Sequence, residues 1–204
     1  AGFFRTTADL NKKLGEDAAF RLNLMYHKAD NGGAEVDKYG LAPTVSWGVG
    51  TKNEFSVGLF HLNVDNIPRS AIRYLQGTVP SLNPKDFYGT SSDYLIGKAT
   101  YGHASWIHRF DNDSELKTQV RTGTFDRSQW GTTAGFGTTN GQPTTIANLG
   151  GNTILTRVGL SPRKDSYDAT YLQSDYSAKA NWLGVKHELL TGIDAAFEKA
   201  NRYS

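Results

Sequence analysis

The residues best suited to chemistry gather in one short segment, 185–194, which contains Lys186, His187, Glu188 and Asp194. A histidine beside carboxylates is an arrangement that general acid and base catalysis uses. In an extended strand, however, Lys186 and Glu188 share one face and His187 lies on the other. The segment also lacks the second histidine, four residues after the first, that the helical zinc-protease motif requires. We therefore interpret it as a strand along a polar wall, and we predict that the protein is not an enzyme.

The histidines of the chain do not form a metal-ligand pattern. His103 and His108 are five positions apart and would lie on opposite faces of a strand. None of the others has the spacing of a known zinc site. We expect neither a metal site nor a cofactor. The five histidines are His27, His61, His103, His108 and His187.

The composition favours β-structure and excludes several classes of function. The 204 residues are 38% hydrophobic and include 22 glycines, 10 tyrosines, 10 phenylalanines and 4 tryptophans. Glycine combined with aromatic residues is typical of β-architecture. There is no cysteine, which excludes a disulfide framework and a thiolate site. A net charge of +2 without a basic cluster predicts no nucleic-acid partner.

A two-residue periodicity divides the chain into about eight strands. In segment 20–27, for example, Phe20, Leu22, Leu24 and Tyr26 alternate with more polar residues. No helical periodicity of useful length competes. The expected strands cover approximately residues 4–11, 20–27, 39–49, 55–65, 94–110, 115–125, 168–180 and 185–197.

The connections between these strands alternate in length. Short connections are expected at 15–17, 50–53, 111–114 and 181–184, and longer ones at 30–37, 65–93 and 126–167. The composition of 131–152 suits a mobile surface segment. Transmembrane β-barrels have short turns at one end and long loops at the other. No run of about 18 apolar residues would form a transmembrane helix, and 1–10 shows neither an initiator Met nor a signal peptide.

Three folds and functions fit this pattern. The first is part of a large membrane barrel, the second a complete small outer-membrane barrel that acts as a pore or an enzyme, and the third a soluble β-sandwich that binds carbohydrate. A barrel exposes Leu22, Leu24, Leu41, Val45, Val57 and Leu59 to lipid, whereas a sandwich buries them. In a barrel the interfacial aromatic girdles would include Tyr26, Tyr39, Trp47, Trp106 and Tyr171.

Several segments together resemble the TonB-dependent siderophore receptors, and most of all their catecholate type. VKHELLTGID (185–194) resembles a recurring strand of that family, and ADLNKKLGEDAAFRLNLMYH (8–27) an early barrel hairpin. DKYGLAPTVSWGVGTKNEFSVGLFHLNVDNIP (37–68) resembles the next hairpin. The resemblance covers nearly the whole chain. It implies an all-β fold, an antiparallel meander of about eight long strands forming an incomplete wedge of a transmembrane β-barrel of roughly 22 strands.

The resemblance also implies a function and a location. Residues 1–204 would be part of the barrel domain of an outer-membrane receptor of a Gram-negative bacterium, which takes up a ferric siderophore. No TonB box, plug domain or closing C-terminal strand is evident, so contact with the TonB complex would be made through an N-terminal region absent here. Outer-membrane lipid would surround the barrel. The loop residues expected to bind the ligand by charge and ring stacking are Arg69, Arg73, Tyr74, Lys85, Tyr88, Arg127 and Trp130.

Overall fold

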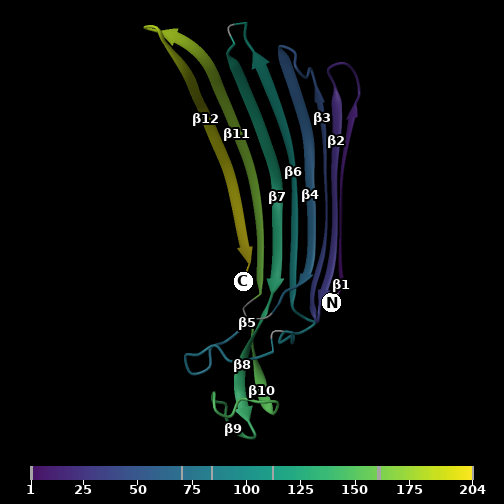
Figure 1. Cartoon of the computed structure of the whole chain (residues 1–204), viewed down its shortest axis with the longest axis vertical. Coiled ribbons are helices and arrows are strands. Elements are labelled where there is room, and N and C mark those ends of the chain that lie inside the picture. Colours follow the sequence, from purple (N-terminus) through teal and green to yellow (C-terminus); the bar gives the residue numbers. More distant parts are fainter. Residues whose placement is uncertain (1, 70, 84, 112, 160–161, 204) are drawn as a thin grey trace.

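Long antiparallel strands make up most of the computed structural model, which describes residues 2–69, 71–83, 85–111, 113–159 and 162–203. Eight of them form one sheet in the order β1-β2-β3-β4-β6-β7-β11-β12 (Figure 1). These strands are β1 (Gly2–Lys13), β2 (Ala19–Asn31), β3 (Ala34–Trp47), β4 (Asn53–Ile67), β6 (Tyr94–Arg109), β7 (Glu115–Trp130), β11 (Arg163–Trp182) and β12 (Val185–Tyr203). No helix in the described part of the chain is long and apolar enough to cross a membrane.

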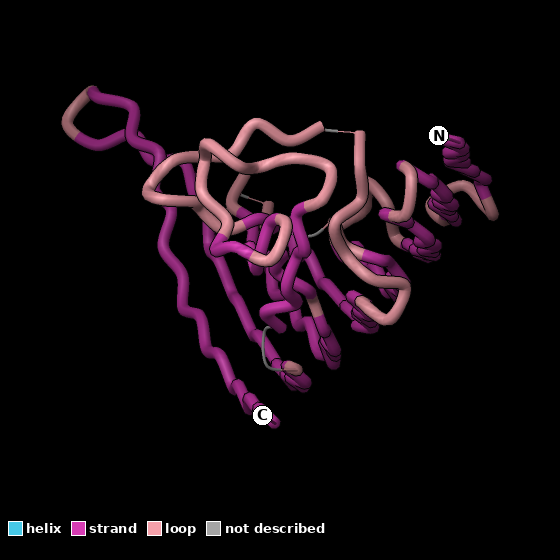
Figure 2. Tube along the Cα trace, turned by 90° about the horizontal axis from the view of Figure 1, so that it is seen from below, coloured by secondary structure: helices cyan, strands magenta, loops and turns pink. Residues whose placement is uncertain are grey.

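The two ends of the sheet differ, as the alternating connections predict. We call the end with the connections 14–18, 48–52, 110–114 and 183–184 the turn end, and the opposite end the loop end. A second, small sheet lies at the loop end (Figure 1). Seen from there, the large sheet is an open arc, and the loops gather over its concave side (Figure 2). The small sheet consists of β5 (Ala71–Ile72), β8 (Thr132–Thr139), β9 (Gln142–Pro143) and β10 (Thr153–Gly159).

Two expectations about the loop end are wrong. The connection expected at 30–37 is a tight turn at Gly32 and Gly33, whose φ angles of 62° and 106° suit glycine. The second concerns the segment 131–152, expected to be a mobile surface segment. Part of it pairs as β8 and β9, and β8 continues the pairing with β10 and β5. Glycine and threonine therefore form strands here, because neighbouring loop strands supply the backbone partners.

The register places the predicted apolar residues on one face, which we call the outward face. Val45 of β3 lies opposite Val57 of β4, and the row continues to Val120 of β7 and Leu172 of β11 through Ala104 of β6. These four large side chains remain 38–48% exposed, although they sit in the middle of the sheet. No second sheet covers them in the described structure, so a β-sandwich is excluded. The prediction of an exposed apolar band is confirmed.

Aromatic residues border this band at both ends. At the turn end, Trp47 stacks on Phe55 with ring centroids 5.5 Å apart, and Trp106 donates a 3.1 Å hydrogen bond from Nε1 to Asn53. Toward the loop end, the Tyr39 ring lies 5.9 Å from His61. Trp47 and Tyr39 are eight residues apart on β3, which is roughly 26 Å along the strand or about 20 Å across a membrane if the strand is tilted.

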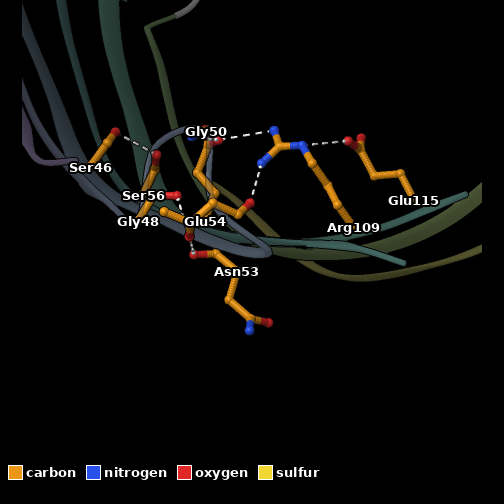
Figure 3. Close-up of polar contacts among 9 residues, drawn as sticks. Ser46, Gly48, Gly50, Asn53, Glu54, Ser56, Arg109 and Glu115 are labelled. Carbon is orange, nitrogen blue, oxygen red and sulfur yellow. Dashed lines mark hydrogen bonds and ion pairs between the residues drawn. The ribbon is translucent and has the colours of Figure 1, made fainter. Parts of the chain in front are cut away.

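The opposite face, which we call the interior face, is polar near the turn end. Arg109 donates to Glu54 at 3.0 Å and pairs with Glu115 at 3.3 Å, and Figure 3 shows its guanidinium between the two carboxylates. On the same face Ser46 and Ser56 share a 2.6 Å hydrogen bond. Polar side chains toward the interior and apolar ones toward lipid are the alternation of a membrane barrel.

The outermost strands of the sheet are not joined. In the described residues β1 pairs only with β2, and β12 only with β11. Every side chain of β1 is exposed, as are nearly all of β12. The sheet therefore does not close on itself, and a small closed barrel of eight strands is excluded. This arrangement leaves both edges able to pair with further strands.

Candidate ligand-binding surface

An aromatic row crosses the interior face toward the loop end. We use this name for Phe60, Tyr101, Phe125 and Tyr167, which come from β4, β6, β7 and β11. The Phe60 and Tyr101 rings are stacked with centroids 4.8 Å apart, and Phe125 follows Tyr101 at 6.2 Å. Tyr167 continues the row 6.1 Å from Phe125. A contiguous row of rings of this kind can present ring edges to the face of a flat aromatic ligand.

Gly123 makes the centre of the row possible. It lies on β7 directly opposite Tyr101, between Arg121 and Phe125 on the same face. A Cβ added at Gly123 would collide with the Cβ and Cα of Tyr101 and with the carbonyl oxygen of Thr100. Because Gly123 has no side chain, the Tyr101 ring can extend over β7 and contact both of its neighbours.

Two tyrosines hold the Arg121 guanidinium beside the row. The guanidinium carbon lies 5.4 Å from the centroid of Tyr101 and 5.3 Å from that of Tyr171, distances at which a cation is attracted to a ring face. The Tyr171 hydroxyl is fixed in turn, because it shares a 2.9 Å hydrogen bond with Tyr167 and donates one of 2.7 Å to Glu198. Among the described residues no carboxylate forms an ion pair with Arg121.

A hollow opens on the interior face next to Arg121, on the side toward the turn end. Its volume is about 370 Å³. It carries cationic and hydrogen-bonding side chains, with no Asp or Glu among the residues that line it. The lining residues are Tyr101, His103, Ala104, Ser105, Lys117, Gln119, Val120, Arg121, Tyr171 and Gln173.

The loop residues expected to bind ligand are only partly brought together. Arg69 and Tyr88 line one cavity of about 370 Å³, in which Arg69 donates to the Asp86 carbonyl at 3.3 Å. Arg69 also lines a smaller cavity with Trp130. Burial, together with the charge of Asp86 and a hydrogen bond to it, raises the pKa of the Tyr88 hydroxyl. The side chains of the other four residues, Arg73, Tyr74, Lys85 and Arg127, are exposed and line none of these cavities.

A buried carboxylate joins the two long loops. Asp93 accepts a 2.7 Å hydrogen bond from Thr132 and one of 3.1 Å from Arg157, whose guanidinium lies 5.6 Å from the centroid of Trp130. We call these four residues the loop latch. Burial raises the pKa of the Asp93 carboxyl, but hydrogen bonds from Thr132 and Thr90 outweigh burial and hold this pKa below its usual range. The latch fixes the small sheet to the segment that directly precedes β6, through Asp93.

Two sequence-based expectations need correction, and one feature was missed. Tyr171 is not a girdle residue, because the register turns it to the interior face beside Arg121. Arg127 and Trp130 do not lie in a loop, because β7 extends to Trp130 and they pair there with Gly97 and Tyr94. Alternation alone did not reveal the aromatic row, since its members come from four strands. The signal that could have found it is the appearance of Phe60, Tyr101, Phe125 and Tyr167 at polar-face positions.

The described residues hold no group of three His, Asp or Glu side chains arranged for a metal ion. His103 lies over Gly58 on the interior face, where a Cβ would meet its ring. His108 shares a 2.7 Å hydrogen bond with Asn53 on the outward face. His103 and His108 therefore lie on opposite faces of the sheet, as the alternation predicts.

Comparison with known proteins identifies relatives along the whole chain, although no family model matches it. The catecholate siderophore receptor Fiu of Escherichia coli strain UTI89 is 25% identical over 221 residues, covering 100% of this chain and 29% of the receptor. Fiu of strain K12 is 31% identical over 141 residues, covering 61% of this chain and 18% of the receptor. The chain therefore spans less than a third of the length of these curated relatives, which are named as receptors.

Solved structures show the same fold. The closed form of the ferric-catecholate import receptor Fiu from E. coli K12 superposes with a TM-score of 0.81 at 21% identity, over 99% of this chain and 30% of that one. The siderophore receptor PiuA of Acinetobacter baumannii gives 0.83 at 19% identity, over 98% of this chain and 29% of that one. The predicted barrel-wedge fold and outer-membrane location are confirmed. In sequence the chain is similar to siderophore receptors, and its fold is similar to a part of their β-barrel.

Proposed function

We propose that residues 1–204 form part of the barrel domain of an outer-membrane receptor that takes up a ferric siderophore in a TonB-dependent manner. The observation that carries this proposal is the aromatic row with Arg121, on the interior face of a wall whose whole length aligns with catecholate siderophore receptors. The outward face, with its apolar band and aromatic borders, contacts outer-membrane lipid.

The interior surface matches the chemistry of a ferric catecholate. Such a complex is anionic and presents flat aromatic rings. Its rings can pack against the edges of Phe60, Tyr101 and Phe125, and its oxygens can pair with the Arg121 guanidinium. The siderophore itself fills the coordination sphere of iron, so the wall needs no metal ligands. The iron complex is the cargo, and the role of this chain is to bind and guide it without covalent chemistry.

The loops make the first contact with the ligand in this proposal. Arg69 and Tyr88 share a cavity, and Arg69 shares another with Trp130, so these three are placed to act together. Arg73, Tyr74, Lys85 and Arg127 add exposed cations and a ring around them. The TonB complex would act through a part of the receptor outside this chain. It would displace whatever fills the lumen, and the ligand would then pass along the interior face.

Iron uptake by cells provides the test. Cells without other iron-complex receptors would receive the whole receptor that contains this wall, and radioactive iron would be supplied as iron(III) tris(catecholate). The proposal predicts uptake that requires the receptor and stops when TonB is deleted. Uptake that persists without TonB would indicate a passive pore. An absence of uptake for this complex and for other ferric siderophores would contradict the proposal.

A further inference from the structure

From the geometry of Arg121 we infer a second binding site within the wall, beside the aromatic row, which takes the anionic oxygens of the ligand after it leaves the loop cavities. This inference rests on the proposed function. The site consists of Arg121, Lys117, Gln119 and Gln173, which share the hollow next to the row. It differs from the loop cavities of Arg69 and Tyr88, which lie at the loop end of the sheet.

The depth of Arg121 shows that it is not a loop residue. On β7 it lies between Val120 and Thr122, whose side chains belong to the outward face. Val120 belongs to the exposed row of Val45, Val57 and Leu172. The guanidinium thus sits at the level of the apolar band, on the opposite side of the wall. A ligand that reaches it has already passed the level of Phe125.

The charge of Arg121 is held in place without being neutralised. Tyr101 and Tyr171 flank the guanidinium, and Glu198 is occupied by the Tyr171 hydroxyl at 2.7 Å. Two other cations of this face have carboxylate partners: Arg21 pairs with Asp9 at 2.7 Å, and Arg109 with Glu54 and Glu115. Arg121 has none among the described residues.

The hollow beside Arg121 is complementary to an anion. Lys117, which lies opposite Asp175 in the register, adds a second cation, and no carboxylate lines the hollow itself. Gln119 donates to Gln173 at 2.7 Å, and Gln173 donates to Asp175 at 2.9 Å, so the amides are ordered along the wall. Guanidinium donors bind anionic oxygens in a planar geometry that an ammonium group does not reproduce. The predicted ligand is therefore an oxygen anion that carries aromatic rings, as a ferric catecholate does.

The test compares equilibrium binding with transport in the whole receptor. Arg121→Gln removes the cation, Arg121→Lys keeps the charge but not the planar fork, and Lys98→Gln removes one cation from the outward face of β6 as a control. The probes are iron(III) tris(catecholate), which is triply anionic, and iron(III) tris(hydroxamate), which is neutral. Binding to de-energised cells reports the loop site, and the uptake rate reports passage along the wall.

We expect Arg121→Gln to slow uptake of the anionic complex by roughly tenfold to a hundredfold, the worth of one charged hydrogen bond. Binding to de-energised cells should change by less than about threefold, which is under 1 kcal/mol. The reason is that this binding reports the loop site, to which Arg121 does not belong. Arg121→Lys should lose only part of the rate, and Lys98→Gln should match the wild type. Any uptake of the neutral complex should be insensitive to all three variants.

Two results would overturn the inference. One is an uptake rate for Arg121→Gln equal to that of Lys98→Gln. The other is slower uptake together with a lower melting temperature of the ligand-free receptor, which would assign Arg121 to a carboxylate of the receptor itself. Failure of the wild type to take up any ferric siderophore is a different outcome, since it rejects the proposed function first.

Discussion

Arg157 donates a hydrogen bond of 3.1 Å from its guanidinium to Asp93, a side chain with no exposed surface. The two residues are 64 positions apart and belong to different loops. Their contact explains why the small sheet has a defined place at the loop end of the wall. It also makes Asp93 the natural residue at which to perturb the loops without substituting any residue proposed to bind ligand.

Replacing the buried carboxylate should release the small sheet. In Asp93→Asn the Arg157 guanidinium loses its anionic partner, which should cost about 1.5–3 kcal/mol of local opening free energy. Backbone amides of β8 and β10 should then exchange with deuterium roughly tenfold to a hundredfold faster in the whole receptor. Asp126→Asn, an exposed carboxylate on β7, is the control. Equal exchange in both variants would show that the latch does not hold the loops.

The latch should also weaken in acid. The folded pKa of Asp93 lies below its usual range, so its stabilising contribution is present above the unfolded value of about 3.9 and is lost as the pH falls through the folded pKa. Exchange of the β8 amides, corrected for the intrinsic pH dependence of exchange, should accelerate below about pH 4. In Asp93→Asn the same corrected rates should be flat across this range, and a parallel acceleration in both proteins would assign the effect to other groups.

The aromatic row depends on the missing side chain of Gly123. Gly123→Ala places a Cβ against the backbone of β6, which cannot rotate away, so the two strands must separate locally. We expect a loss of stability of about 1–3 kcal/mol and a displaced Tyr101 ring. Gly97→Ala is the matched control, because its Cβ would meet Val64 at an ordinary 3.7 Å. A crystal structure of the whole receptor with Tyr101 unmoved in Gly123→Ala would refute this explanation.

The two faces of β4 should respond differently to charge. Val57→Arg places a cation in the lipid-facing band and should cost about 2–4 kcal/mol of unfolding free energy in vesicles. Ser56→Arg, one residue away on the interior face, gives up only the hydrogen bond to Ser46 and should cost about 1 kcal/mol. Urea unfolding of the whole receptor in lipid vesicles measures both. Equal costs would mean that both faces meet the same solvent.

The sequence predicted most of the wall because one face of each strand meets lipid and the other meets water. That difference gives Leu22 and Leu24, and likewise Val57 and Leu59, their spacing of two, and it marked the strands between short turns. The pattern weakens toward the loop end, where Lys98 and Asp126 lie opposite each other on the outward face. There the outward face is polar and the interior face carries the aromatic row, so the usual alternation is lost, and the extension of β7 and the tight turn at Gly32 were not foreseen.

The binding surface was less predictable for a different reason. Tyr171 is of a residue type common in aromatic girdles, and only the register of β7 and β11 shows that it lies beside Arg121. The aromatic row requires the pairing of four strands to be known, because its members are remote in sequence. Asp93 and Arg157 are ordinary loop residues until the fold places them in contact. Periodicity identifies the face of a residue within one strand, whereas these sites are built across strands.

Chemical accessibility of single cysteines tests the central claim most directly, namely that this chain is a membrane-embedded wall with a lipid face and a lumen face. The chain has no native cysteine, so Val57→Cys, Val120→Cys and Leu172→Cys would report the outward face, and Ser56→Cys, Gln119→Cys and Gln173→Cys the interior face. Spin labels on the whole receptor in vesicles would be probed with oxygen, which partitions into lipid, and with a water-soluble nickel chelate. We predict that the outward labels respond to oxygen and the interior labels to nickel, alternating along each strand. Labels on both faces that respond equally to the nickel chelate would contradict the account.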